Sequence, residues 1–411
     1  MSLGSLNNSA SIIMNMLQPK NATAVGVDRL IRKEVSLGSI REMTPPQDHI
    51  GLQIAPFLEV PSDDVIFDYL AVETDGLAPA RAEDAESELA RKDDATVGQG
   101  RASVIDWSIK DHYDASEVNH WRELAAIVEA MRGGSLPLTI SGAVNDFASK
   151  VARDQARRRR KLDNRLEWLT MSALSDGAIT YDDGRIKFNV DYGRPADQKA
   201  GNAAADLAAA DITDGVWNIS SNTHDPIKTF NEINQLMFDR YGVHVGSVIG
   251  SRKAFNKFVN SDKFSQRAGL GAAYTGSGSA VAPDPAYLID GWGPLAARAV
   301  VENATGIKLI EYDAVYRTRP FGSGTVTSNR FVPEGRLIFL PAEADLSDID
   351  ETQVGFAKTL TSPHPEGNWS PGFYEWEKSD VDPWGQDMGN GIKAFPVFPF
   401  MELTYAVNVT M

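Results

Sequence analysis

The chain has 411 residues, of which 42% are hydrophobic and 23% charged, as in soluble globular proteins with two or three domains. It has no cysteine, which excludes disulfides, thiol catalysis and thiolate metal sites. Its formal net charge of −16 argues against a general nucleic-acid binder, and with no long apolar run and no secretion signal we expect neither a membrane span nor export.

The first 48 residues contain no long periodic segment, although Ser11–Leu17 is too apolar for a solvated tail. Strands are predicted at 65–71 and 102–109, which are rich in β-branched and aromatic residues. The polar connection between them, residues 72–101, is too long for a loop inside a compact domain. We therefore expect either a projecting hairpin ordered by a neighbouring molecule or a disordered insertion.

An amphipathic helix is predicted at 116–131, where Gly133-Gly134 ends it. A much longer helix is predicted at 143–176, because apolar or small residues recur at steps of three or four residues or sums of these, and no Pro or Gly interrupts the segment. Gly177 stands where a C-terminal glycine cap belongs. A β-hairpin follows over 179–190, with its turn at Asp182-Asp183-Gly184.

A second unit is predicted to start at Asp225-Pro226, a helix N-cap followed by proline at the first helical position. That helix should end at Gly242. The remaining elements alternate between the two types: a strand at 243–249, a helix at 252–264, and strands at 307–316, 336–340 and 400–410.

The long helix and its hairpin carry a family resemblance. The helix contains Arg165-Leu-Glu167 and closes with Ala173-Leu174-Ser-Asp-Gly177, and the hairpin leads into Val190-Asp191-Tyr192-Gly193-Arg194. This order resembles the major capsid protein E family of tailed phages, typified by the phage lambda head protein. The resemblance implies the Hong Kong 97-type capsid fold, in which a long "spine" helix backs a sheet.

The resemblance further implies how the α+β chain is divided. The expected parts are an N-terminal arm at 1–50, an extended-loop hairpin at 51–110, a peripheral domain at 111–221 with its spine helix at 143–176, an axial domain at 222–385, and a return strand of the peripheral domain at 386–411. The strand at 400–410 would then rejoin the sheet beside the spine helix.

Seven basic residues cluster on the predicted long helix, against only Asp154 and Asp163: Arg153, Arg157, Arg158, Arg159, Arg160, Lys161 and Arg165. They span more than one turn, so they surround the helix and cannot all face one core. If the helix lies near the inner surface of a shell, they could screen the phosphates of packaged DNA without regard to sequence. Pairing with acidic residues of an adjacent subunit, such as those at 83–94, is the alternative, and the sequence does not choose between them.

Motifs for catalysis and for cofactor binding are absent from the sequence: there is no phosphate loop, zinc-binding helix pair or serine nucleophile elbow. His112 and His120 could join a metal site with nearby aspartates, but surface histidines are commoner. Asp345 and the acidic residues after it lack the spacing of a calcium loop. The tryptophan-rich stretch 369–384 is interpreted as structural anchoring rather than a ligand site.

The sequence therefore predicts a non-enzymatic major capsid protein without catalytic, cofactor or metal residues, a subunit of an icosahedral phage head around double-stranded DNA. We expect hexamers and pentamers, a separate scaffold protein and portal, non-specific contact with DNA, no membrane, and assembly in the host bacterial cytoplasm before residence in the virion. Whether a decoration protein binds or subunits are cross-linked is left open. The alternatives are an encapsulin-type nanocompartment shell and a cytoplasmic α+β enzyme.

Overall fold

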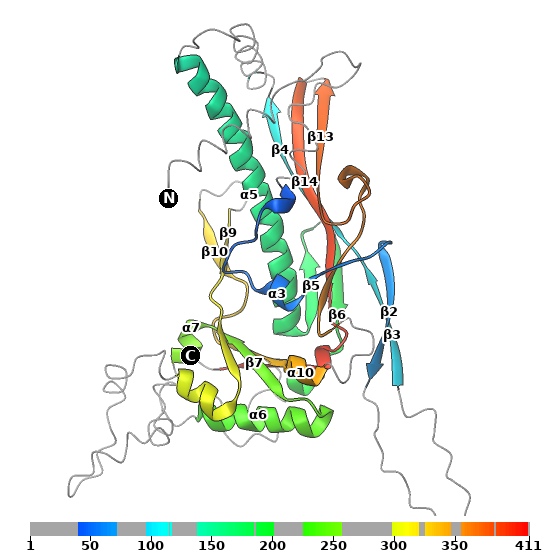
Figure 1. Ribbon diagram of the computed structural model, residues 1–411, viewed down its shortest axis with the longest axis vertical. Helices are drawn as coiled ribbons and strands as arrows, with labels where there is room; N and C mark the ends of the chain where they lie inside the picture. The colour runs from blue at the N-terminus through cyan, green and yellow to red at the C-terminus, as the bar shows by residue number, and fades with distance from the viewer. Residues whose placement is uncertain are drawn as a thin grey trace, which may run out of the picture.

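The computed structural model describes residues 40–71, 96–114, 116, 138–184, 186–200, 225–256, 298–319, 325–346, 355–381 and 384–409. These residues form two units: the upper one in Figure 1 contains a long helix and a five-stranded sheet, and the lower one contains a four-stranded sheet. Helices and strands from distant parts of the sequence mix in both units, which confirms the α+β class.

The long helix α5 runs from Leu138 to Asp176, so it begins before the predicted start at 143. Its 39 residues make a rod about 58 Å long. It ends where predicted, because Gly177 adopts a φ of +70°, in the left-handed region that favours glycine. The Gly177 N–H donates to the Ala173 carbonyl over 2.8 Å and closes the last turn.

The sheet behind α5 is centred on β14 (Trp384–Val397), which pairs antiparallel with strands on both of its edges. Along one edge it pairs with β4 (Asp106–Asp114), and along the other with β13 (Phe373–Val381) and then β12 (Lys358–Thr361). The short strand β1 (Phe57–Glu59) adds to β12 in parallel.

Apolar side chains of α5 hold the helix against this sheet. Leu162 and Leu166 are buried in one cluster with Phe373 and Ile392. Further along the helix, Leu169 joins a larger cluster that includes side chains of the lower unit. Burying each such side chain contributes roughly 1.5–3 kcal/mol, so this apolar face fixes the helix in place.

The lower unit has the strand order β15-β11-β7-β8, formed by Tyr405–Asn408, Arg336–Pro341, Val245–Gly250 and Lys308–Glu311. Helix α6 (Pro226–Tyr241) covers it, and its predicted caps are confirmed. The Asp225 carboxylate accepts from the Lys228 N–H over 3.1 Å, and Gly242 ends the helix with a φ of +70°.

Three antiparallel hairpins stand outside the two sheets, and Figure 1 shows each as a separate ribbon. The predicted hairpin after α5 is confirmed. The three are β5 with β6 (Ala178–Asp182 and Lys187–Asp191), β2 with β3 (Asp64–Ala71 and Thr96–Ser103), and β9 with β10 (Val315–Thr318 and Thr327–Arg330).

The remaining elements are short. They are the α-helices α3 (Gly51–Ile54), α7 (Arg252–Asn256) and α10 (Glu343–Leu346), a helical stretch at 298–305, and the 3-10 turns Ala196–Gln198, Pro365–Gly367 and Met401–Leu403. None of the helices in the described ranges is both long and apolar enough to cross a membrane.

The single strand predicted at 307–316 is wrong, because the chain forms β8 and β9 with a turn between them. At the break, the Asp313 carboxylate accepts from the Arg252 N–H over 3.0 Å and pairs with Arg330. The strand predicted at 102–109 likewise covers the end of β3 and the start of β4. The chain changes partner there, since Val104 bonds to Asp63 and Ile105 bonds to Ala394.

The position expected for the last strand is also wrong. Residues 405–408 do not rejoin the sheet beside α5 but pair antiparallel with β11 of the lower unit. The strand that does return to the upper sheet is β14, nearly all of which lies in the expected return segment 386–411. It pairs there with β12 and β13, two strands that the sequence analysis expected in the unit at 222–385. A 3-10 turn at Met401–Leu403 separates β14 from β15 and carries the chain between the two sheets.

Several sequence predictions lie outside the described residues. They concern the N-terminal arm before residue 40, most of the connection 72–101, the helix at 116–131, and the part of the helix at 252–264 beyond residue 256.

Candidate functional site: the basic face of helix α5

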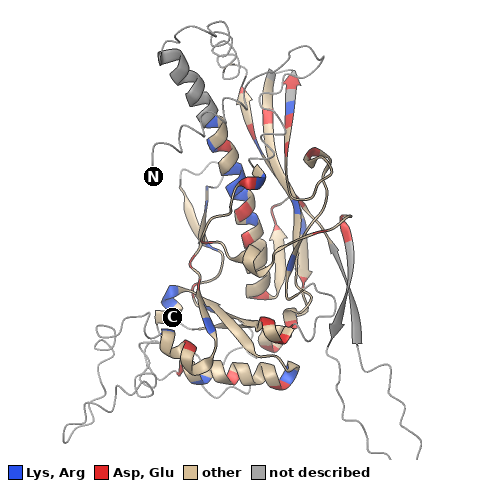
Figure 2. Cartoon of the chain, viewed as in Figure 1, with Lys and Arg blue, Asp and Glu red and all other residues tan. Residues whose placement is uncertain are grey.

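The seven basic residues predicted as a patch divide into two groups on α5. Figure 2 shows Lys and Arg positions along the middle of the helix. Arg158 and Arg159 are buried and Arg165 is half-buried. The other four are exposed: Arg153, Arg157, Arg160 and Lys161. The prediction that the run surrounds the helix is therefore correct.

Arg158 is held between the helix and the sheet. Its Nη1 lies 2.8 Å from Asp111 of β4, and its Nε donates to Asn390 of β14 over 3.1 Å. Its side chain is only 1% exposed. A buried guanidinium needs such partners because an unpaired charge in the interior costs several kcal/mol. Arg158 is therefore part of the fold and is not available to a polyanion.

Arg159 is satisfied in the same way, one position further along the helix. Its Nε bonds to Asp163 over 2.9 Å, and its guanidinium lies 3.3 Å from the centre of the Phe373 ring. Burial lowers the pKa of Arg159 and raises the pKa of Asp163, while the attraction between the two opposes both shifts. The contact between Arg159 and the Phe373 ring fastens α5 to β13.

Arg165 faces three aromatic rings rather than an acid. Its guanidinium lies 5.2 Å from Trp107, 5.3 Å from Trp168 and 4.9 Å from Tyr181, measured to the ring centres. Cations in such positions are attracted by the negative ring faces. Arg165 thus joins α5 to β4 and to the β5–β6 hairpin.

The four exposed cations fall on one side of the helix. Positions 157, 160 and 161 follow position 153 by four, seven and eight residues, which places all four within about one third of the circumference. Arg157 pairs with Asp154 over 2.6 Å. We call these four residues the basic stripe: Arg153, Arg157, Arg160 and Lys161. They are the part of the predicted patch that a second molecule can reach.

A buried carboxylate near the lower end of α5 was not singled out by the sequence. Glu167 accepts from the Ile50 N–H over 3.1 Å, the Gly51 N–H over 2.8 Å and the Tyr312 hydroxyl over 2.6 Å. Burial raises the pKa of Glu167, and the three donors oppose that shift. It joins α5 to α3 and to the lower unit. The available signal was an acid next to the apolar residues Leu166 and Trp168 in the Arg165-Leu-Glu167 motif.

Two arginines bind the C-terminal end of α5. Arg194 donates to the Leu174 carbonyl over 2.7 Å and to the Thr404 hydroxyl over 2.9 Å. Arg336 of β11 donates to the Ser175 carbonyl over 3.1 Å and pairs with Asp176 over 2.6 Å. The last carbonyls of a helix lack partners within it and carry partial negative charge, so cations stabilise them.

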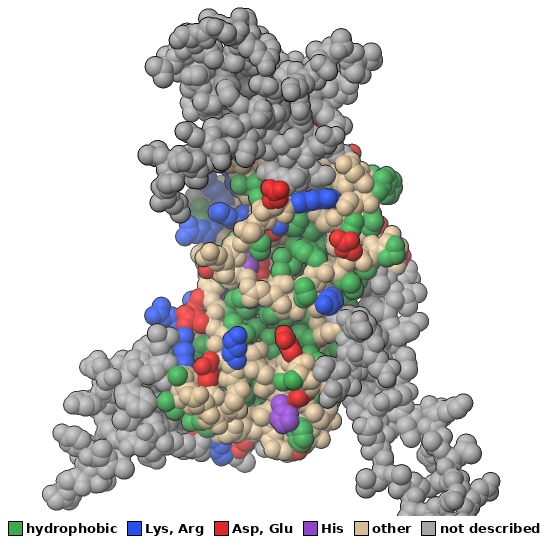
Figure 3. All heavy atoms as spheres, viewed as in Figure 1, with side chains coloured by type: hydrophobic (Ala, Val, Ile, Leu, Met, Phe, Trp, Pro, Cys, Tyr) green, Lys and Arg blue, Asp and Glu red, His purple; other side chains and the backbone are tan. Residues whose placement is uncertain are grey.

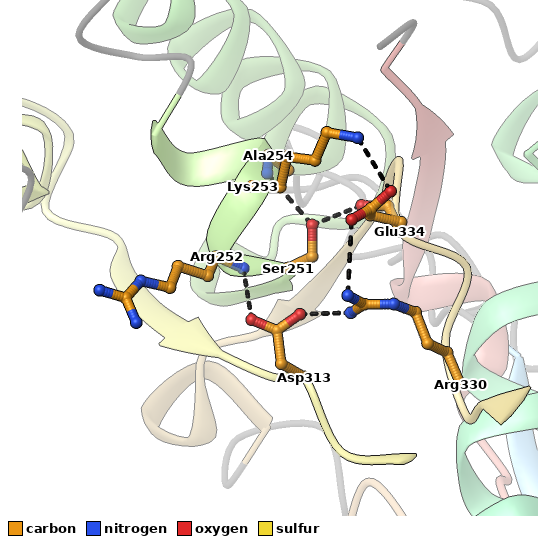
Figure 4. Close-up of polar contacts among 7 residues, drawn as sticks. All are labelled: Ser251, Arg252, Lys253, Ala254, Asp313, Arg330 and Glu334. Atoms are coloured by element: carbon orange, nitrogen blue, oxygen red, sulfur yellow. Dashed lines mark hydrogen bonds and ion pairs between the residues drawn. The ribbon is translucent and has the colours of Figure 1, made fainter. Parts of the chain in front are cut away.

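A second polar cluster fixes the base of the β9–β10 hairpin (Figure 4). Arg330 lies between Asp313 and Glu334, and Lys253 reaches Glu334 over 3.1 Å. Ser251 caps α7, since its hydroxyl accepts from the Ala254 N–H over 3.1 Å. A two-stranded hairpin is marginal alone in water, and these contacts root it on the lower unit.

The other candidate ligands that lie in the described ranges have partners within the fold; His120 and the acidic residues at 348–351 lie outside those ranges. His112 bonds to Asp387 over 2.6 Å, which raises the pKa of His112. Asp345 accepts from the backbone and the ring of His244. Trp376 donates to the Ser108 hydroxyl over 3.0 Å, which is the anchoring expected of the tryptophan-rich stretch, whereas Trp369 is exposed. In the described ranges no group of three or more His, Asp or Glu side chains could hold a metal ion.

A family model described as phage major capsid protein E matches residues 58–348, more than half of the chain. The chain belongs to this family. It is therefore a major capsid protein, a shell-forming structural subunit of a phage virion, and the resemblance found in the sequence is confirmed. The encapsulin alternative is the weaker one, because the family that matches is a phage capsid family.

Solved structures similar to this capsid protein are distant in sequence. One is described as a prophage capsid protein of Escherichia coli CFT073 (13% identity, 92% of this chain and 97% of that chain, TM-score 0.49). Others are a phage-related protein of Bordetella bronchiseptica (14%, 94% and 98%, 0.46) and an encapsulin of Synechococcus elongatus (9%, 97% and 95%, 0.37). No curated protein sequence matches the chain. The assignment rests on the family match.

Proposed function

We propose that this capsid protein assembles as hexamers and pentamers into an icosahedral head that encloses double-stranded DNA. Membership of the phage major capsid protein E family is the observation that carries the proposal. The scaffold and the portal are separate proteins, assembly takes place in the host bacterial cytoplasm, and the role is structural rather than catalytic. The domain names of the resembled fold are part of the same proposal, with β12 to β14 assigned to the peripheral domain.

Electron microscopy of the purified chain, expressed alone and with its neighbouring genes, tests this proposal. Closed shells, sheets or ring-shaped capsomers are the expected result. A chain that stays monomeric or dimeric under both conditions and at every salt concentration would overturn it.

The basic stripe is proposed to contact the phosphates of the packaged DNA. Three of the seven predicted cations are bound inside the subunit, whereas Arg153, Arg157, Arg160 and Lys161 lie exposed along one side of α5. A line of cations on a rigid helix suits a polyanion whose charges repeat along a rod. Such contacts read no base sequence, as a shell that holds any genome requires.

A quadruple variant that replaces the four stripe residues with glutamine tests the contact. We expect the variant to assemble, and the slope of log affinity for duplex DNA against log salt to fall by about 3–4 relative to the native chain. The matched control changes four exposed cations elsewhere: Lys187, Arg252, Lys308 and Arg317 to Gln. The control removes the same net charge and should leave most of the slope intact.

The same pair of variants separates the two roles that the sequence left open. If the stripe instead pairs with acidic residues of an adjacent subunit, the stripe variant should fail to form capsomers while the control assembles. If both variants lose DNA binding equally, the effect belongs to net charge, and the specific role of the stripe is refuted.

A further inference from the structure

The sheet of the upper unit has a second face, which points away from α5. Phe373 and Ile392 point toward the helix and are buried in the apolar cluster beneath it. Side chains alternate along a strand, so Tyr374 and Trp376 of β13 lie on the opposite side of the sheet. We call this side the outer face. It receives aromatic side chains from the tryptophan-rich stretch 369–384.

Glycines of β14 leave room for these rings to lie flat. A Cβ added at Gly389 would lie 2.3 Å from the Trp376 ring, so a larger residue there would displace the indole. Gly391 has the same relation to the Tyr374 ring, also at 2.3 Å. The Trp376 indole N–H donates to the Ser108 hydroxyl of β4 over 3.0 Å, which fixes the ring across the middle strand. One side of each ring therefore rests on backbone, and the other side points outward.

The outward side of the Tyr374 ring already holds a flat partner. The His364 ring stacks on it with 3.8 Å between ring centres and 8° between the ring planes. His364 is itself fixed, because its Nδ1 accepts from the Glu366 N–H over 3.1 Å. Trp376 lies next to this stack and is partly exposed, and no ring of the described residues stacks on it. The Trp376 indole is therefore an open surface of the same kind.

Trp369 presents a second indole beside His364. Its side chain is 72% exposed. Figure 3 shows hydrophobic side chains protruding at the right-hand edge of the upper unit, where Figure 1 places the loop between β12 and β13. Its φ of 55° is rare for a bulky residue, and the His364 carbonyl holds it there by accepting from the Trp369 N–H over 3.1 Å. Strained residues of this kind gather at binding sites, and a fixed indole loses little entropy when a partner covers it.

The charges on the outer face are balanced. Its lysines lie beside carboxylates: Lys110 is 2.5 Å from Asp387, Lys378 is 2.6 Å from Asp380, and Lys393 is 2.8 Å from Asp63. A polyanion therefore gains little here, in contrast to the basic stripe. An uncharged partner with many hydroxyl groups can instead donate to the carboxylates and accept from the ammonium groups.

We propose that the outer face binds an uncharged polysaccharide, with Trp369 and Trp376 stacking on its sugar rings. The C–H groups on the flat side of a sugar carry partial positive charge, which the negative face of an indole attracts. The paired charges around the two indoles then bind the hydroxyl groups at the rim of each sugar.

The position of this face in a shell follows from the helix. The basic stripe lies on the side of α5 opposite Leu162 and Leu166, which contact the sheet. A shell whose stripe faces DNA therefore turns the outer face outward, and this part of the proposal rests on the proposed function. Many copies on one shell add up contacts that are weak individually.

Affinity electrophoresis of the unassembled chain tests the binding. The native gels contain dextran, mannan, galactan or hydroxyethylcellulose, which are uncharged, or dextran sulfate as a polyanion. We expect at least one uncharged polymer to retard the chain. Trp369→Gly and Trp376→Ala should each lower the association constant about tenfold, as expected for the loss of one stacked aromatic contact. The control, Phe238→Ala, removes an exposed aromatic side chain of the lower unit and should leave the constant unchanged.

Retardation by none of the uncharged polymers, or by dextran sulfate alone, would overturn the proposal. Equal retardation of Trp369→Gly and the control would also overturn it, since glycine accepts the φ of 55° without strain and this variant should fold like the native chain. Closed shells that fail to bind a polymer bound by the subunit would refute the outward position. A chain that binds the polymer but forms no shells would refute the proposed function and support the binding site.

Discussion

The buried carboxylate of Glu167 should be worth several kcal/mol to the subunit. In the native chain, Oε1 of Glu167 accepts from Ile50 and Tyr312, and Oε2 accepts from Gly51. Glu167→Gln keeps the shape of the side chain but replaces one of these two oxygens with an NH₂ group. At least one buried donor then faces an NH₂ group, which costs about 1–3 kcal/mol. Glu167→Ala leaves all three donors without their acceptor and should cost about 3 kcal/mol or more.

Urea denaturation of the unassembled subunit, followed by circular dichroism, measures these losses. Hydrogen exchange of a peptide over 49–55 locates them, because the Ile50 and Gly51 amides should lose protection first. The matched control is Glu343→Gln, the same change at an exposed glutamate of α10, with an expected effect within about 0.5 kcal/mol. If Glu167→Gln behaves like this control, the carboxylate does not hold the units together.

A substitution at Gly51, which donates to the Glu167 carboxylate, should also destabilise the subunit. A Cβ added at Gly51 would lie 2.5 Å from Glu167 Oε2, nearer than two such atoms can approach. Gly51→Ala should therefore push the carboxylate away from its donors and destabilise the subunit. In the Glu167→Gln background it should cost less than in the native chain, because the two changes damage the same contact.

The pH dependence of Glu167 follows from its raised pKa. The folded state binds this proton more tightly than the unfolded state, whose pKa is near the ordinary 4.5. The contribution of the group to stability is therefore largest below about 4.5 and declines as the pH rises through the raised pKa. The stability advantage of the native chain over Glu167→Gln should shrink across that window and then level off. An advantage that grows with pH would contradict this assignment.

Three other predictions concern polar contacts of the same unit. Arg158→Gln should cost about 1–3 kcal/mol because it removes buried hydrogen bonds to Asp111 and Asn390. Arg160→Gln should stay within about 0.5 kcal/mol; urea midpoints compare them. Arg194→Lys should cost about 1–3 kcal/mol in the same assay, since an ammonium cannot reach all of the acceptors at the end of α5. The pKa of His112 should lie above 6.5, so the pairing of His112 with Asp387 weakens as the pH rises through this raised pKa. In Asp387→Asn the pKa of His112 should return toward 6.5; NMR titration measures the pKa in the native chain and in the variant.

Local chemistry explains which parts of the fold the sequence could predict. Gly177 and Gly242 mark helix ends, and Asp225 marks a helix start, through contacts within four residues of themselves. The β5–β6 hairpin is equally local. The choice of sheet for β15 does not depend on local contacts, because the partner strand β11 lies more than sixty residues away in the sequence. The alternating pattern of β15 would suit either sheet.

The candidate site was predictable to a similar extent. The spacing of the basic residues showed that some must face outward, and the structure identifies Arg153, Arg157, Arg160 and Lys161. That Arg158 turns inward depends on Asp111 and Asn390, which come from strands far away in the sequence. Glu167 was missed for the same reason, since its three donors come from two distant segments.

The path of the chain between the two sheets has a consequence for how a subunit is made. The upper sheet needs β14, which ends at Val397, and the lower core needs Tyr405 and Val407, both fully buried in it. A ribosome must therefore synthesise nearly all of the 411 residues before either core can close. A prematurely terminated chain that lacks these strands can complete neither core, so we expect it not to present the surfaces that a shell-forming subunit needs.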